Sequence, residues 1–256
     1  MKLATWNVNG VRARLARLID WLRTSRPDVV CLQEIKVEDA GFPAADLAAL
    51  GYQSAAFGQK TYNGVAILAR APLADVARGF ADGGDEDQAR FLAATVLGVH
   101  VMSCYVPNGS DVGSEKFAYK LSWMERLRAY LARRPAGESA ALCGDLNVAP
   151  ADLDCYDPAA WAGQILCSAE ERAAFARLLE AGLIDVVRRL HPNEPMYTWW
   201  DYRQLAFPKN RGLRIDHILA TAPLAPYVLA ASVDREARKG AQPSDHAPLV
   251  CEIADA

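Results

Sequence analysis

Short apolar runs that recur along the whole chain place the strongest constraint on its fold. Residues 2–6, 29–34, 64–70 and 91–97 are such runs, and their length and β-branched content are typical of buried strands. They outnumber the helical segments, so we expect extensive β-sheet. Further predicted strands are 52–57, 99–106, 139–147, 196–203, 213–220, 227–233 and 247–253.

Helical patterns occur in both halves of the chain. Apolar residues recur at helical spacing from Val11 to Leu22, and residues 114–134 form a second predicted helix that ends before Pro135. Because the helices alternate with strands throughout, we expect one domain over residues 1–256, with helices packed outside a two-sheet core. A third helix, over 168–181, starts with a capping box of Ser168 and Glu171, and 79–88 is predicted to be an exposed loop.

Composition excludes a membrane protein but leaves nucleic-acid binding open. Hydrophobic residues make up 52% of the chain, yet none of its apolar runs approaches the roughly 20 residues of a membrane span. The start MKLATWNVNG lacks the pattern of an export signal. Six cysteines are scattered without a C-x-x-C pair, so we expect a reduced, cytoplasmic protein. The net charge of −3 argues against wholesale nucleic-acid binding, but carboxylates that hold a cation also count as negative.

Several apolar runs end on polar residues that can bind a metal ion. If these ends converge at the rim of a sheet, they form a single acidic pocket. Carboxylate oxygens are ligands that suit Mg²⁺ or Mn²⁺. The polar ends are Asn7 and Asn9, Gln33 and Glu34, Tyr105 to Asn108, Asp145 and Asn147, Asp216 and His217, and Asp245 and His246.

Each of these motifs also has an ordinary structural interpretation. Glu34 can be a surface acid at the end of a strand, and GDLN (144–147) can be an Asx turn. In the functional interpretation, Gly144 allows a bend after the strand. Asp145 and Asn147 then face the same side if the chain stays extended.

Asp216 lies within the apolar run LRIDHIL, where a buried acid needs a partner. The adjacent His217 would point to the opposite face of a strand, so His246 is the expected partner. By the same argument Asp245 points away from its neighbour His246, and we expect it to face the metal.

The order of the motifs W-N-V-N-G, L-Q-E, Y-V-P-N, G-D-L-N, R-I-D and S-D-H resembles the exonuclease III family of AP endonucleases. That family lies within the endonuclease/exonuclease/phosphatase superfamily, which includes DNase I. The resemblance runs from residue 3 to about residue 253 and is carried by LQEIKV, YVPNG, GDLNVAP, NRGLRIDHIL and PSDHAPL. It implies an α/β fold, a four-layered α/β sandwich in which two mixed sheets pack face to face with helices outside.

The resemblance also implies an activity. We expect a Mg²⁺-dependent (or Mn²⁺-dependent) DNA phosphodiesterase of base-excision repair that uses one or two ions. This enzyme is expected to cleave 5′ of abasic sites and to remove nucleotides or blocked ends from duplex DNA in the 3′ to 5′ direction. Separately from the resemblance, we expect a monomer.

Residue by residue, the resemblance implies three sets of site residues. The catalytic set is Tyr105, Asp145, Asn147, Asp216 and His246, and the metal set is Asn7, Glu34, Asp145, Asn147, Asp245 and His246. The expected DNA contacts are Asn108, Trp199, Leu213, Ile215, Arg12, Lys36, Lys116, Lys120, Lys209 and Arg211. The general base is left open between Asp145 and the pair His246–Asp216.

Two other functions compete with this one. An RNA or small phosphate ester substrate is disfavoured by the LQE-x-K and NRGLRID motifs. A catalytically inactive nucleic-acid-binding module is disfavoured because the set Glu34, Asp145, Asn147, Asp216 and His246 is complete.

Overall fold

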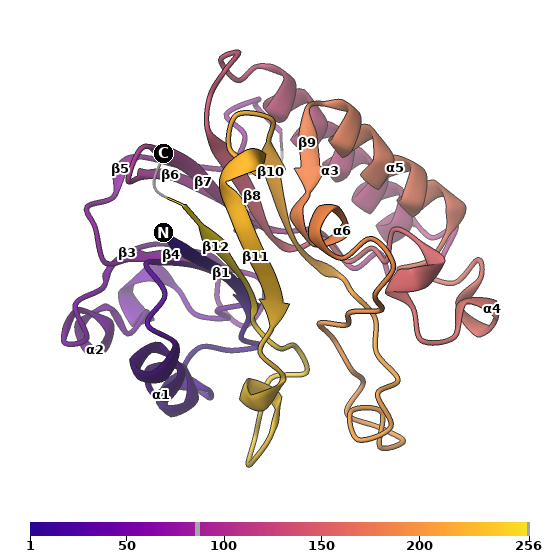
Figure 1. Cartoon of the computed structure of the whole chain (residues 1–256), viewed down its shortest axis with the longest axis horizontal. Coiled ribbons are helices and arrows are strands. Elements are labelled where there is room, and N and C mark those ends of the chain that lie inside the picture. The colour runs from indigo at the N-terminus through magenta and orange to yellow at the C-terminus, as the bar shows by residue number, and fades with distance from the viewer. Residues whose placement is uncertain (85–87, 255–256) are drawn as a thin grey trace.

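Two six-stranded sheets pack face to face in the computed structural model of the chain, and helices cover their outer faces (Figure 1). This arrangement confirms the predicted four-layered sandwich. The structure describes residues 1–84 and 88–254, so residues 85–87 of the predicted loop 79–88 lie outside the described part.

The first sheet has the strand order β11-β12-β1-β2-β4-β3. β1 pairs in parallel with β2 and antiparallel with β12, so the first and last strands along the chain are neighbours. The amino group of Met1 donates to the backbone oxygen of Ile253 at 2.6 Å, which ties the start of β1 to the end of β12. Its strands are β1 (Lys2–Asn7), β2 (Val29–Gln33), β3 (Gln53–Phe57), β4 (Val65–Ala69), β11 (Val228–Val233) and β12 (Leu249–Ile253).

The second sheet has the strand order β5-β6-β7-β8-β10-β9. β7 and β8 are parallel, and β8 pairs antiparallel with β10. This pairing brings the carboxyl ends of β7 and β8 to the same edge as the start of β10. Its strands are β5 (Ala74–Arg78), β6 (Phe91–Val96), β7 (Val99–Tyr105), β8 (Ala140–Asp145), β9 (Leu183–Asp185) and β10 (Asp216–Thr221).

The main hydrophobic core fills the space between the two sheets, where Cys31 and Ile67 of one sheet pack in the same cluster as Val101 and Cys143 of the other. Two further clusters lie under the helices on the outer faces. In Figure 1, α1 and α2 flank the first sheet, and α3 and α5 flank the second. The helices are α1 (Leu15–Ser25), α2 (Ala44–Ala48), α3 (Glu115–Ala132), α4 (Pro158–Trp161), α5 (Ala169–Glu180) and α6 (Val186–Leu190), with 3-10 turns η1 (Asp39–Gly41), η2 (Asp152–Asp154), η3 (Ala225–Tyr227) and η4 (Arg235–Arg238).

The prediction of a strand over 196–203 is wrong. Only isolated bridges form there, from Trp199 to Leu213 and to His246. The indole of Trp200 is fully buried among loop residues, so its apolar surface stabilises a loop cluster instead of a sheet face. The first helix also begins at Leu15 and not at Val11, because the chain turns between them. No helix in the described part is long and apolar enough to cross a membrane.

Candidate active site

Polar residues at strand ends of both sheets meet at one edge of the sandwich. Asn7 ends β1 and Glu34 directly follows β2, so both belong to the first sheet. Asp145 ends β8 and lies opposite Asp216, the first residue of β10, in the second sheet. His246 comes from the loop before β12. The site therefore spans the boundary between the two sheets.

Three of these side chains form a potential metal site. Ligand atoms of Glu34, Asp145 and His246 all lie within 4.8 Å of one another. The amide of Asn7 donates to Glu34 Oε1 at 2.8 Å and to Asp145 Oδ2 at 2.9 Å, which fixes both carboxylates. In addition, the buried Oδ1 of Asp216 has no hydrogen-bond partner among the described residues. The carboxylate oxygens of Glu34 and Asp145, together with a buried acid oxygen left without a donor, fit a divalent cation.

The structure brings the predicted pair Asp216 and His246 together. His246 Nδ1 lies 2.8 Å from Asp216 Oδ2, and Nε2 lies 3.7 Å from Asp145 Oδ2. Burial opposes the charged ring, but the carboxylates of Asp216 and Asp145 outweigh it and raise the pKa of His246 to about 10. Burial raises the pKa of Asp145 to about 7, although the charge of His246 acts against this rise. The carboxylates on both sides of the ring therefore favour its protonated form.

Gly144 and Asn147 differ from their expected geometry. Gly144 lies within β8, where a Cβ atom would be 1.9 Å from the carbonyl oxygen of Cys104 in β7. Its role is to allow close approach of two parallel strands, and the bend comes later. Asn147 has a φ of 50°, so the chain turns and is not extended there. Its backbone N–H donates to Asp145 Oδ1 at 2.9 Å and holds that carboxylate.

Tyr105 and Asn108 lie beside this carboxylate. Burial, followed by the negative charge of Glu34, raises the pKa of Tyr105 well above its ordinary value, so the phenol remains a donor. The guanidinium of Arg90 lies over its ring at 4.9 Å, a contact that sequence reasoning missed. Asn108 is exposed, and its amide nitrogen lies 3.3 Å from Asn147 Oδ1.

Asp245 lies next to the cluster but outside the three residues that form it. Its two carboxylate oxygens accept hydrogen bonds from the Asn9 amide and the Trp199 indole, both at 3.0 Å. Burial opposes its charge, but His246 and these two donors outweigh that effect and lower the pKa of Asp245. Its role as a metal ligand stays a prediction, as does that of Asn7, which presents its amide N–H to the acids.

The three residues expected to line a pocket for a base-less sugar share one apolar cluster. Leu213 and Ile215 are buried, whereas Trp199 is half-buried. The ring of Trp161 meets that of Trp199 edge-on at 6.5 Å between centroids. Sequence reasoning missed Trp161, which lies in a segment without strand or helix periodicity.

The basic residues expected to contact DNA fall into two groups. Lys36 is half-buried and pairs with Glu34 Oε2 at 2.8 Å. Lys120 corrects our expectation, because its side chain is fully buried and its ammonium pairs with Glu171. Such a group cannot reach a DNA backbone in this structure. The remaining residues, Arg12, Lys116, Lys209 and Arg211, are exposed.

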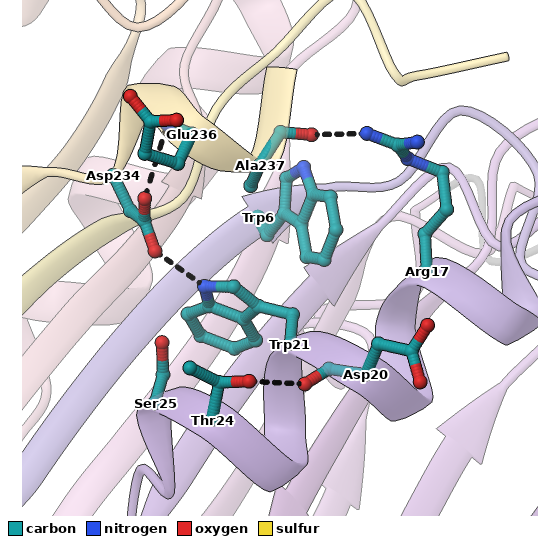
Figure 2. Close-up of a pocket in the computed structure, with 9 residues that line it drawn as sticks. All are labelled: Trp6, Arg17, Asp20, Trp21, Thr24, Ser25, Asp234, Glu236 and Ala237. Carbon is teal, nitrogen blue, oxygen red and sulfur yellow. Dashed lines mark hydrogen bonds between the residues drawn. The ribbon is translucent and has the colours of Figure 1, made fainter. Parts of the chain in front are cut away.

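A separate cavity of about 290 Å³ lies between α1 and η4 (Figure 2). Trp6 and Trp21 form its apolar wall, and the Trp21 indole donates to Asp234 Oδ2 at 2.9 Å. The Trp6 indole donates to the backbone oxygen of His246 at 3.1 Å. Trp6 therefore connects the wall of this cavity to the backbone of the loop that carries His246.

Comparison with known proteins places this geometry in context. A sequence profile of the Endonuclease/Exonuclease/phosphatase family matches residues 4–246. The exodeoxyribonuclease III of Haemophilus influenzae is 37% identical over 266 residues, which cover 99% of this chain and 100% of that protein. A 3′ phosphatase from Neisseria bound to a product DNA hairpin superposes with a TM-score of 0.96 at 43% identity, and both chains are covered completely. An AP endonuclease from Archaeoglobus fulgidus superposes with a TM-score of 0.95 at 41% identity, again over all of both chains.

Proposed function

The chain belongs to the endonuclease/exonuclease/phosphatase family, and within it we propose a metal-dependent DNA phosphodiesterase of the exonuclease III and AP endonuclease type. It hydrolyses duplex DNA 5′ of abasic sites and removes nucleotides or blocking groups from 3′ ends. The observation that carries this proposal is the cluster of Glu34, Asp145 and His246, in which Asp216 holds the imidazole.

Each side chain has a task in this reaction. Glu34 and Asp145 would hold a divalent cation, which when bound would neutralise charge at the phosphate and at the leaving oxygen. Asp145 accepts the proton of the attacking water, and the backbone N–H of Asn147 orients that carboxylate. His246 donates from Nε2 to a non-bridging phosphate oxygen, while Asp216 accepts from Nδ1 and orients the ring.

Asp145 is the better candidate for the general base. The ring of His246 lies between the carboxylates of Asp216 and Asp145, which favour the imidazolium form. An imidazolium has no free nitrogen lone pair with which to accept a proton. The alternative base, the pair His246–Asp216, is therefore disfavoured by its own surroundings.

The proposal also specifies the metal ion, the residues that contact DNA and the oligomeric state. We propose Mg²⁺ as the ion, a single domain that acts as a monomer, and duplex DNA as the partner. All six cysteines are buried and free, which agrees with a cytoplasmic location. The DNA contacts proposed are Trp199 at the lesion and Arg12, Lys36, Lys116, Lys209 and Arg211 along the backbone.

One assay tests the proposal. The protein is incubated with a duplex that contains a single abasic analogue and, in parallel, with an intact 3′-recessed duplex, each with Mg²⁺ or with EDTA. We expect cleavage of both duplexes with Mg²⁺ and of neither with EDTA. Cleavage that persists in EDTA, or two uncut duplexes, would reject the proposal.

A further inference from the structure

A buried ammonium group lies directly behind the candidate active site. Lys120 is on α3, and its side chain is fully buried where α3 packs against α5. Its Nζ donates to the backbone oxygens of Asn108 at 3.1 Å and of Asn147 at 2.7 Å, and to a carboxylate oxygen of Glu171. A lysine ammonium has three N–H donors, so each of them is used.

Glu171 connects the same ammonium to a third segment. It occupies the capping box of α5, where Oε2 accepts from the N–H and the hydroxyl of Ser168 at 3.0 and 2.6 Å. Its Oε1 also accepts from the N–H of Leu166 at 3.0 Å. The oxygen of Leu166 in turn accepts from the N–H of Ala149, two residues after Asn147. One ion pair therefore joins two helices to the loops at 106–110, 146–149 and 165–168.

We propose that Lys120 is a positioning residue for the candidate active site, which fixes the backbone of Asn108 and Asn147 so that the N–H of Asn147 stays on the carboxylate of Asp145. Asn147 has a φ of 50°, in the left-handed region, and the ammonium holds the carbonyl of this turn. The side chains of the two asparagines contact each other at 3.3 Å. The ammonium of Lys120 therefore sets the position of the loop 106–110 relative to the loop 146–149.

The choice of a charged pair at this position supports the inference. Burial of two charges is costly, and a well-packed apolar pair is often at least as stable. Stability alone therefore does not explain an ammonium here, whereas its ability to bind two backbone oxygens does. The fit around its stem is also close, because a Cβ atom on Gly109 would lie 3.0 Å from Cδ of Lys120.

Three variants separate positioning from simple stabilisation. Lys120→Met removes the ammonium and keeps the length of the stem. Lys120→Met/Glu171→Gln removes both buried charges and keeps one amide oxygen that can accept from Ser168 in the α5 cap, while the N–H of Leu166 loses its carboxylate acceptor. Leu127→Ala, a fully buried residue on the same helix, is the control that weakens the packing of α3 without removing a hydrogen bond to either loop.

Two measurements are made on each variant. The first is kcat and KM on the 3′-recessed duplex with Mg²⁺, well below each Tm, and it depends on the proposed function. The second is amide hydrogen exchange of the metal-free protein, and this measurement does not depend on the proposed function. The amides to follow are those of Val106, Asn147, Ala149 and Leu166, which are hydrogen-bonded in these loops.

We expect both Lys120 variants to lose roughly 10- to 100-fold in kcat with KM within threefold, because a displacement of about 1 Å is enough for such a loss. Exchange should rise about tenfold at the four amides. The double variant should regain the Tm that Lys120→Met loses, because no unpaired charge stays buried. Its kcat should stay as low as that of Lys120→Met. Leu127→Ala should lower Tm while kcat and these amides stay at wild-type values.

Two results would overturn the inference: a double variant with wild-type kcat, or wild-type exchange at the four amides in both Lys120 variants. An inactive wild-type protein refutes the proposed function instead, and the exchange data then still decide the role of Lys120.

Discussion

Replacement of Gly144 by alanine tests whether the spacing of β7 and β8 controls the site. Gly144 is fully buried in β8 and immediately precedes Asp145. With a φ of 152°, its backbone directs an added Cβ toward Cys104, where it would lie 1.9 Å from the carbonyl oxygen and 2.8 Å from the carbonyl carbon. Both obstacles are backbone atoms, which cannot rotate away.

The size of the effect follows from these distances. Cβ atoms essentially never approach other atoms within 3.0 Å, so the strands must separate by more than 1 Å, from 1.9 Å to beyond 3.0 Å. A displacement of about 1 Å beside Asp145, the proposed general base, reduces kcat by roughly 10²-fold. Overpacking of this kind costs up to about 3 kcal/mol, which lowers Tm by roughly 6 to 12 °C in a chain of this size.

The assay compares Gly144→Ala with Gly98→Ala. Gly98 also has a left-handed φ, 78°, but an added Cβ would meet nothing within 4 Å. That control therefore suffers backbone strain of about 1 kcal/mol without displacement of a strand. Calorimetry gives Tm, and cleavage of the 3′-recessed duplex with Mg²⁺ gives kcat. Gly144→Ala with the kcat and Tm of Gly98→Ala would refute the reasoning.

Three further predictions concern single side chains. Asp145→Asn and His246→Ala should each lower kcat by at least roughly 10²-fold while duplex binding measured by gel shift is kept, and near-normal turnover contradicts the assigned roles. Trp199→Ala should raise KM for the abasic duplex by about tenfold through lost ring contact, and steady-state kinetics with an unchanged KM would count against a lesion contact. Burial, and then the charge of Arg214, lowers the pKa of His217 to about 4. As the pH falls, His217 is protonated in the unfolded chain at a higher pH than in the folded chain. The free energy of unfolding therefore decreases by up to roughly 3 kcal/mol as the pH falls from about 6.5 to 4. Urea unfolding across this range should show that loss in wild type but not in His217→Gln, and equal losses in the two proteins would contradict it.

Much of the fold could be predicted because a buried strand needs a local run of apolar residues. β2 and β4 are fully buried and satisfy this condition. β5 was missed since all its residues are exposed, and β9 because it has only three residues. Residues 196–203 show the reverse error, because aromatic residues there pack between loops, as the buried Trp200 does.

The centre of the site could also be predicted, since a buried acid such as Asp216 needs a cation within reach. The surroundings of Lys120 could not. A lysine in an amphipathic helix normally faces solvent, and only the packing of α3 on α5 places Glu171 opposite it. The turn at Asn147 and the two donors to Asp245 depend in the same way on segments distant in sequence.

The pairing of β1 with β12 has a consequence for protein synthesis. Among the described strands, β1 is synthesised first. Glu252, the register partner of Lys2, belongs to β12, which is synthesised last among them. His246 is also made only shortly before β12. A growing chain therefore carries Glu34 and Asp145 for much of its translation without the imidazole and without a closed first sheet. On the proposed function, His246 joins the site only after Glu34, Asp145 and Asp216 have been made.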